Sequence, residues 1–253
     1  MLRVLLARAD RSLPEAQQAL ERRGFSVVPA PVLTLRPAHE RVADRAAAQR
    51  LDQFDAVIVI SEAAAELGLK RLEAFWPQWP IHPRWYAVGR RSARALEARG
   101  LTVTVPSPES TEGLLALPAL ASARETLLLK GAGGRPALEE TLKGWGQKVT
   151  VLPLYTRVPA PCPLPAPEAI DVVVVGSGEC LDALLAAGGE GFRAKALLAP
   201  SERVAERARE LGFPQAQAVL SLAPGPLAEA LARLSRLPRE GDNEGTGIDG
   251  ELR

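Results

Sequence analysis

Short runs of Val, Leu and Ile alternate along the chain with longer stretches in which apolar residues recur every three or four positions. Continuous apolar runs are typical of buried parallel strands, and the longer period is typical of helices that cover a sheet. The runs predict strands at Arg3–Ala7, Ser26–Ala30, Ala56–Ile60, Trp85–Val88, Thr102–Val105, Thr126–Leu129, Lys148–Leu152, Val172–Val175, Ala196–Ala199 and Ala216–Leu220. The longer period predicts helices at Pro14–Arg23, Arg41–Phe54, Glu62–Phe75, Arg90–Arg99, Thr111–Leu117, Arg135–Trp145, Glu179–Ala187, Ser201–Leu211 and Pro226–Leu237. Alternating strand and helix predicts parallel sheets covered on both faces.

Proline and glycine mark the ends of these helices. Proline is tolerated in a first helical turn, and a glycine after the last turn can adopt the left-handed conformation that ends a helix. The prolines in first turns are Pro14, Pro136 and Pro226. The glycines that follow helices are Gly24, Gly100, Gly146 and Gly212.

Two stretches of the chain repeat one pattern without a gap. The stretch from Val4 to Pro37 aligns with the stretch from Thr126 to Pro159, and DAVIVIS (55–61) aligns with DVVVVGS (171–177). A repeated strand–helix pattern predicts two similar α/β lobes, and a two-lobed molecule is expected to bind its ligand in the gap between them.

The repeat leaves two ways of dividing about ten strands into two sheets of about five each. Consecutive halves could form the lobes, or the lobes could be nested. We favour nesting, in which residues 1–32 and 160–237 form one domain and residues 40–152 form a second domain inserted in it. Residues 33–39 and 153–159 would then be two linker strands running side by side. The tail at 238–253 is polar and Gly-rich without periodicity, which predicts disorder.

Composition narrows the class of protein. A length of 253 residues with 47% hydrophobic residues suits one large or two modest domains. A net charge of +1 argues against a general nucleic-acid binder. No apolar run approaches the roughly 20 residues that span a bilayer. The start of the chain resembles a signal peptide only superficially, because its apolar part is short and interrupted by Arg8, and no small-residue cleavage site follows. We therefore expect a cytoplasmic protein, monomeric, with no membrane or nucleic-acid partner.

Cysteine and histidine give no metal-binding spacing. Cys162 lies in a proline-rich connector and Cys180 opens a predicted helix, so both are expected to be free thiols in a reducing compartment. His39 and His82 have no partner His or Cys at ligand spacing. We expect no metal site.

Small or basic residues leave the carboxyl ends of the predicted strands, where open parallel sheets bind ligands. Free backbone N–H groups and the helix dipole make such turns favourable for anions, and several of them suggest a ligand with several negative groups. Every α/β protein has such turns, so each could also be a plain connection. The residues at these positions are Arg8, Ser61, Gly89, Lys130, Gly131, Ser177, Gly178 and Ser201.

The segment KGAGGRP (130–136) resembles a phosphate cradle, but it matches neither a dinucleotide fingerprint nor a Walker loop. Four basic residues, Arg8, Arg11, Lys130 and Arg135, lie at equivalent ends of the repeat. They suit carboxylate recognition and could equally be solvated loop charges.

Tyr155 is the one reactive side chain at a distinctive position. It lies in the second predicted linker strand, where its repeat counterpart is Leu33, and no catalytic triad or paired carboxylates accompany it. A phenol can donate a proton to a departing oxygen. A tyrosine on such a strand can also serve packing alone.

Over residues 2–237 the chain resembles the uroporphyrinogen-III synthase family. The resemblance rests on the order and spacing of VLLAR (4–8), DAVIVIS (55–61), YAVGRRSARALEARG (86–100), STEGLL (110–115), LLLKGAGGRPALEETLKGWGQKVTVLPLYTRVP (127–159) and VVVVGS (172–177). It implies two similar flavodoxin-like parallel-sheet α/β domains joined by a two-stranded linker, the second inserted in the first. It also implies a hydro-lyase without cofactors that closes hydroxymethylbilane, a linear tetrapyrrole with eight carboxylates, into uroporphyrinogen III with loss of water and inversion of ring D.

The resemblance also implies roles for particular residues. Tyr155 falls on the family's linker tyrosine, which is proposed to assist departure of the hydroxyl group. Ser92 occupies the hydroxyl position of a Val-Gly-x-x-Thr-Ala pattern, and Ser61 and Ser177 match strand-end serines. One departure stands out: the segment Pro200–Ala205 lacks the family's threonine pair and contains an acidic residue.

Two other functions remain possible at this point. The scaffold could be a non-catalytic two-lobed binding or sensor module for a polyanion, which loss of the threonine pair favours. A nucleotide-dependent transferase using KGAGGRP lacks a nucleotide motif and an acidic metal pair. Retention of Tyr155, Ser92 and the strand-end serines favours the synthase, whose main contribution would be to orient a flexible polyanion.

Overall fold

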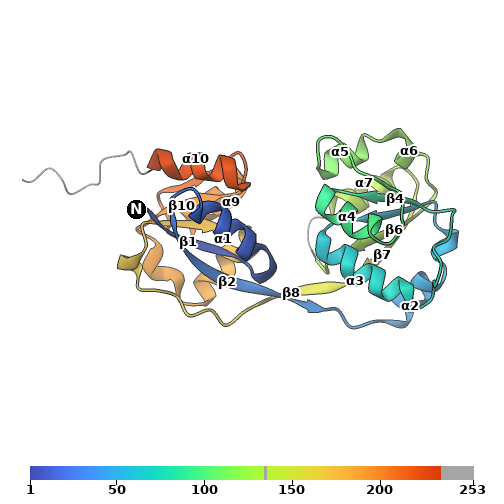
Figure 1. Ribbon diagram of the computed structural model, residues 1–253, viewed down its shortest axis with the longest axis horizontal. Helices are drawn as coiled ribbons and strands as arrows, with labels where there is room; N and C mark the ends of the chain where they lie inside the picture. The colour runs from blue at the N-terminus through green and yellow to red at the C-terminus, as the bar shows by residue number, and fades with distance from the viewer. Residues whose placement is uncertain (134–135, 235–253) are drawn as a thin grey trace, which may run out of the picture. The chain divides into compact units, whose positions relative to one another are not determined.

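The computed structural model describes residues 1–133 and 136–234 (Figure 1). The chain divides into two compact units. Unit 1 consists of Met1–Thr34 together with the chain from Pro159 onward, and unit 2 of Leu35–Val158. The tail at 238–253 and the predicted end of the last helix at Leu237 lie outside the described residues.

Unit 2 is built on a parallel sheet whose strand order is β5-β4-β3-β6-β7. Its strands are β3 (Ala56–Val59), β4 (Arg84–Ala87), β5 (Val103–Thr104), β6 (Glu125–Lys130) and β7 (Lys148–Pro153). The central strand β3 is apolar and buried throughout, and its neighbour β6 is buried from Thr126 to Leu129, because helices cover both faces of these strands. Successive side chains point to opposite faces, so each strand contributes to two cores.

Helices cover the two faces of this sheet. On one face α2 (Val42–Gln49), α3 (Glu62–Glu73) and α4 (Arg90–Glu97) pack against Val57, Val59, Leu127 and Leu129. On the other face α5 (Thr111–Leu115), α6 (Pro118–Ala121) and α7 (Ala137–Gly144) pack against Ala56, Ile58 and Leu128. α3, α4, α5 and α7 each come next in the chain after a strand of this sheet, so their N-termini lie at its carboxyl edge.

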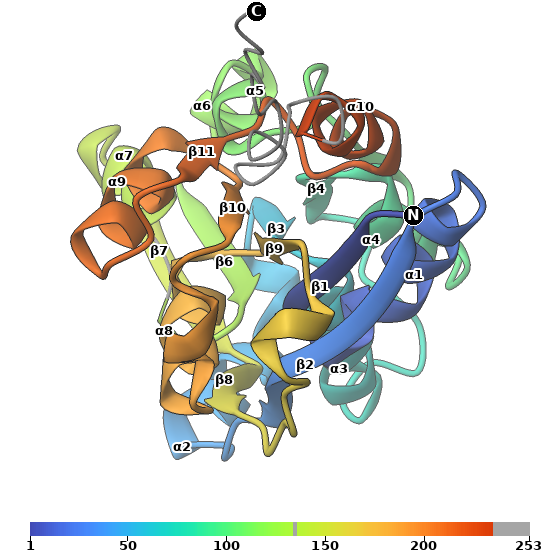
Figure 2. The same cartoon turned by 90° about the vertical axis from the view of Figure 1, so that its left-hand side faces the viewer.

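Unit 1 has a sheet of the same design. The strand order is β11-β10-β9-β1-β2-β8, with the first five strands parallel. The strands are β1 (Arg3–Ala9), β2 (Ser26–Pro37), β9 (Val172–Val175), β10 (Ala196–Ala199) and β11 (Ala216–Ala218), and the last strand of the sheet, β8 (Tyr155–Pro159), belongs to unit 2 up to Val158. Figure 2 shows α8 (Gly178–Ala186) and α9 (Glu202–Glu210) on one side of the sheet and α1 (Leu13–Glu21) and α10 (Pro224–Leu234) on the other, as the two cores require. Short 3₁₀ helices in the two units are η1 (Asp10–Ser12), η2 (Leu51–Gln53), η3 (Pro167–Ala169) and η4 (Gly189–Phe192).

The two sheets are equivalent in space but permuted along the chain. In both, the strand that begins the 34-residue repeat (β1 or β6) lies next to the strand of the DxVxV repeat (β9 or β3). The same contact joins them: Asp171 accepts a hydrogen bond from the Arg3 N–H at 2.8 Å, and Asp55 accepts one from the Glu125 N–H at 2.9 Å. In chain order, unit 1 follows the flavodoxin-like arrangement 2-1-3-4-5. The fold is thus the nested pair of α/β domains, with unit 2 inserted in unit 1.

Two strands connect the units. Their pairing is antiparallel, because the Ala38 N–H donates to the Leu154 carbonyl at 2.9 Å while the Ala160 N–H donates to the Val32 carbonyl at 3.0 Å. Moving toward the C-terminus along the first linker strand therefore pairs it with residues that lie progressively toward the N-terminus of the second. β2 continues past the predicted end at Ala30 to Pro37 because it carries this pairing.

Local details correct two predicted helices. The helix predicted over Arg41–Phe54 ends at Gln49 and gives way to η2. The helix predicted over Thr111–Leu117 ends at Leu115, and a separate helix, α6, begins at Pro118 after Leu117 in an extended conformation (φ −77°, ψ 115°). A residue before proline is driven out of the helical region. The four glycines predicted to end helices are confirmed, with φ of 85°, 77°, 82° and 95°.

Candidate functional site

The junction of β3 and β6 is the point in unit 2 where the chain changes direction across the sheet, and ligands of doubly wound sheets bind at such points. Ser61 follows β3 and caps α3, its hydroxyl accepting the Ala64 N–H at 3.2 Å. Lys130 ends β6 and Gly131 follows it. These residues lie at one edge of the sheet because β3 and β6 are parallel neighbours.

Tyr155 is fixed at this junction by its backbone and by its ring. The Leu154 N–H donates to the Lys130 carbonyl at 2.8 Å, and the Ala132 N–H donates to the Tyr155 carbonyl at 2.6 Å. The ring lies against Gly131, where an added Cβ would be 2.5 Å from Cε2. Glycine is therefore the residue that lets the ring approach this strand end, and Tyr155 is only 3% exposed.

The phenol oxygen of Tyr155 has a polar neighbour on each side. It lies 3.0 Å from the Ser61 Oγ, and either hydroxyl can donate. An Arg157 guanidinium N–H donates to it at 3.4 Å, and the guanidinium carbon lies 5.5 Å from the centre of the tyrosine ring. The structure thus joins two predicted site residues, Ser61 and Tyr155, with an arginine that the sequence reasoning did not single out.

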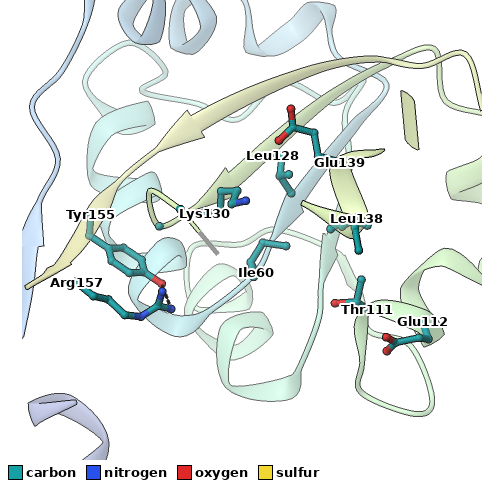
Figure 3. Close-up of a pocket in the computed structure, with 12 residues that line it drawn as sticks. Ile60, Thr111, Glu112, Leu128, Lys130, Leu138, Glu139, Tyr155 and Arg157 are labelled. Carbon is teal, nitrogen blue, oxygen red and sulfur yellow. Dashed lines mark hydrogen bonds between the residues drawn. The ribbon is translucent and has the colours of Figure 1, made fainter. Parts of the chain in front are cut away.

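A cavity of about 240 Å³ opens beside Tyr155. Figure 3 shows Tyr155 and Arg157 at one end, Thr111 and Glu112 at the other, and Ile60 between them. The wall is completed by Leu128, Lys130, Gly131, Gly133, Ala137, Leu138 and Glu139. The lining combines apolar side chains with two cations, Lys130 and Arg157, and two carboxylates, Glu112 and Glu139.

Lys130 and Gly131 therefore line the same cavity as Tyr155. Within residues 1–133 and 136–234, no carboxylate pairs with the Lys130 ammonium group. Its charge is available to an anionic ligand. The other basic residue predicted on this loop, Arg135, lies outside the described residues.

The predicted site residues Gly89 and Ser92 lie at the start of α4 and do not line this cavity. The Arg90 N–H at this helix N-terminus donates to the Glu109 carboxylate at 2.8 Å. The same carboxylate oxygen lies 2.9 Å from where a Cβ on Gly89 would be. Ser92 is buried, at 4% exposure. The anion-binding turn predicted here already holds a carboxylate of the chain itself.

In unit 1 the equivalent junction of β1 and β9 brings Arg8 near the start of α8. The Arg8 guanidinium donates to the Leu222 carbonyl at 3.0 Å, and its stem packs against Gly176. Ser177 caps α8 by accepting the Cys180 N–H at 3.1 Å. Gly178 is the first residue of that helix. Arg11 lies exposed in η1.

Ser201 begins α9 without making a side-chain cap, and its Oγ is buried with no hydrogen-bond partner among the described residues. The neighbouring Glu202 carboxylate accepts a hydrogen bond from Arg209 at 2.5 Å. The acidic residue that departs from the family pattern is therefore paired along its own helix. Its charge is partly neutralised there.

The two cysteines are free and buried. Burial raises the pKa of the Cys162 thiol and also that of the Cys180 thiol, so both stay protonated at neutral pH. Ser177 donates a further hydrogen bond to the Cys180 sulfur at 3.3 Å. These features fit a packing role. Among the described residues, no helix combines the length and apolar character needed to cross a membrane.

Sequence reasoning missed Arg157, Thr111, Glu112 and Glu139 as pocket residues. Arg157 carried a usable signal, because it stands two positions after Tyr155 and alternate residues of a strand share a face. Thr111 and Glu112 lie in the STEGLL segment. They form the first turn of the short helix α5, which Ser110 caps by accepting the Gly113 N–H at 3.0 Å.

Comparison with known proteins gives one consistent family. The family model described as "Uroporphyrinogen-III synthase HemD" matches residues 14–220. The uroporphyrinogen-III synthase of Salmonella typhimurium is 35% identical over 188 residues, which are 68% of this chain and 75% of that protein. The one from Escherichia coli is 32% identical over 204 residues, 72% of this chain and 80% of that protein.

Solved structures share the fold at lower identity. A mutant uroporphyrinogen III synthase of Thermus thermophilus matches with a TM-score of 0.59 at 20% identity, covering 93% of this chain and 99% of that one. Uroporphyrinogen-III synthetase of Helicobacter pylori matches with a TM-score of 0.60 at 14% identity, covering 92% of this chain and 100% of that one.

Proposed function

The chain belongs to the uroporphyrinogen-III synthase family, and from this premise we propose that the cavity beside Tyr155 is where it acts on hydroxymethylbilane. Its activity is that of a uroporphyrinogen-III synthase, an enzyme of tetrapyrrole biosynthesis. The assignment of individual residues is our proposal. It is supported chiefly by the phenol of Tyr155, which lies 3.0 Å from Ser61 at the edge of a cavity.

Tyr155 acts as the proton donor in the first step. The electron pair of the terminal pyrrole pushes out the hydroxyl group of the hydroxymethyl carbon, and the C–O bond breaks. The phenol proton moves to the departing oxygen, which leaves as water, and the pyrrole becomes an electrophilic azafulvenium ion. Proton donation at the moment of bond breaking is the usual work of a general acid.

Orientation is the second contribution of the protein. A flexible chain of four pyrroles must be held so that closure inverts the last ring, and positioning of this kind supplies a large share of many rate enhancements. Lys130 binds a substrate carboxylate near Tyr155, and the Gly131 backbone allows close approach. Ile60 and Leu128 give the pyrrole ring an apolar surface.

The strand ends of unit 1 hold further carboxylates. Arg8 supplies a positive charge, and the starts of α8 and α9 at Ser177, Gly178 and Ser201 supply backbone N–H groups and helix dipoles. In unit 2, Gly89 and Ser92 offer a similar turn once the Glu109 carboxylate moves aside.

The proposal extends to the organisation of the protein. Residues 1–32 with 160–237 and residues 40–152 act as two domains, and the strands over 33–39 and 153–159 act as their linker. The enzyme works as a cytoplasmic monomer. Gel filtration with light scattering tests the oligomeric state.

Product analysis tests the function directly. Freshly prepared hydroxymethylbilane is incubated with the protein, and the type I and type III uroporphyrinogens are oxidised and separated by chromatography. We expect the type III isomer to dominate. Type I product alone, at the rate of the unassisted reaction, would reject the assignment.

A further inference from the structure

Arg157 and Tyr155 form a pair on one strand. They are two positions apart on β8 and so share a face, with the guanidinium 3.4 Å from the phenol oxygen and 5.5 Å from the ring centre (Figure 3). Tyr155 is buried, whereas Arg157 is exposed. The positive charge therefore reaches the phenol from the solvent side while leaving the ring in the core.

The donors and acceptors of the two side chains determine which of them donates the hydrogen bond. A phenol has one proton to donate and an oxygen that accepts hydrogen bonds, while a guanidinium can only donate. Arg157 therefore donates to the phenol oxygen. Ser61 already accepts the Ala64 N–H, and its own hydroxyl proton can point to the phenol oxygen. With both neighbours donating, the phenol proton is left for a third group.

We propose that Arg157 is a positioning residue for the proton transfer: it turns the phenol proton of Tyr155 toward the cavity and stabilises the phenolate that remains. This inference rests on the role proposed above for Tyr155. A cation that donates a hydrogen bond to an oxyanion interacts with it more strongly than with the neutral hydroxyl. The contact therefore strengthens as the proton leaves, which is the condition for lowering a barrier.

The protons and charges of the step balance. The O–H bond of Tyr155 breaks, its proton joins the departing hydroxyl as water, and the oxygen keeps the electron pair. The negative phenolate lies beside the positive guanidinium of Arg157, and the azafulvenium ion carries the positive charge left when the C–O electron pair departs with the oxygen. When the closed macrocycle loses a proton from its new ring junction, one proton returns to the phenolate and the enzyme is restored.

The test is a double-mutant cycle of Arg157→Gln and Tyr155→Phe, with kcat and KM measured for each. We expect Arg157→Gln to lower kcat about tenfold with little change in KM. This loss is at the low end of the range for a hydrogen bond to a charged group, because Arg157 is exposed to solvent. Tyr155→Phe lowers kcat at least about a hundredfold. In the Tyr155→Phe background, Arg157→Gln has no further effect, because no phenolate remains to be stabilised.

Two further variants complete the experiment. Arg157→Lys keeps a positive donor and recovers part of the lost kcat, which a purely structural role would not produce. Arg36→Gln is the matched control, since it removes the same charge from an exposed position on the other linker strand, and it keeps the wild-type kcat. Circular dichroism and melting curves establish that each variant is folded.

The outcomes separate the two proposals. An Arg157→Gln loss that persists in the Tyr155→Phe background, or that appears as a rise in KM, overturns the inference and makes Arg157 a substrate-binding residue. An unchanged kcat in Arg157→Gln overturns it as well. Full activity in Tyr155→Phe refutes the general-acid role itself, whatever Arg157 does.

Discussion

Replacing Gly131 with alanine tests whether the Tyr155 ring must occupy its observed position. The added methyl carbon would lie 2.5 Å from Cε2 and 2.7 Å from Cζ of that ring. Carbon atoms in contact are separated by about 3.5–4.0 Å, so the ring must move by about 1 Å. Gly131 is not one of the glycines with a positive φ, and its backbone can accept alanine. The clash therefore falls on the ring and not on the Gly131 backbone.

Two magnitudes follow from this displacement. Overpacking of this kind costs about 1–3 kcal/mol, and each kcal/mol lowers the melting temperature by about 2–4 °C for a chain of this size. The phenol oxygen is bonded to Cζ, so it shifts with the ring and disturbs the 3.0 Å contact with Ser61. Misplacing a reacting group by about 1 Å costs roughly a hundredfold in rate. We expect activity to fall far more than stability.

The assay measures kcat on hydroxymethylbilane together with thermal unfolding. Gly144→Ala is the matched control: Gly144 is exposed at the end of α7 and an added Cβ meets nothing within 4 Å. Alanine there should leave kcat unchanged and stabilise the helix by up to about 1 kcal/mol. A Gly131→Ala protein with wild-type kcat would refute the claim that the ring position matters for the reaction.

Three further predictions concern charges. Glu109→Gln removes the carboxylate that occupies the start of α4, so KM should fall about two- to fivefold, equivalent to about 0.3–1 kcal/mol; an unchanged KM would show that this turn binds no substrate. Arg8→Glu and Lys130→Glu, assayed separately, should each raise KM by placing a negative charge against substrate carboxylates, and an unaltered KM in either would remove that residue from the site. The Glu125 N–H and other donors hold the pKa of Asp55 below its ordinary value, so its stabilising effect is present above about pH 4 and is lost as the pH falls through its folded-state pKa. Asp55→Asn should therefore lower the melting temperature at pH 7, and a gap of the same size at pH 3 would contradict this reasoning.

The strands and helix ends were predictable because local rules govern them. Val172–Val175 is a strand in the sequence pattern and in the structure, since an uninterrupted apolar run is stable only when covered on both faces. Gly24 and Gly146 end helices as expected because few other residues tolerate their φ. The early end of the helix predicted over Thr111–Leu117 could also have been inferred from Pro118, which restricts the residue before it.

The candidate site was only partly predictable, because its contacts join distant segments. Ser61 and Tyr155 were each singled out from the sequence, but their 3.0 Å contact depends on the pairing of β3 with β6 and on the docking of β8. The Glu109 carboxylate at the start of α4 comes from a loop with no periodicity. Nothing in the pattern of residues fixes where such a loop turns, so its effect on Gly89 could not be foreseen.

The placement of β1 between β2 and β9 has a consequence for biosynthesis. Arg3 and Asp171, which join the two strands, are 168 positions apart, and unit 2 lies between them in the chain. At about 5–20 residues per second, a ribosome needs on the order of ten seconds or more to deliver β9 after β1 has emerged. Unit 2 can fold in that interval, while β1 has not yet paired with β9 and its apolar side chains are still uncovered. Nascent chains stalled before β9 should therefore be the form most prone to bind chaperones.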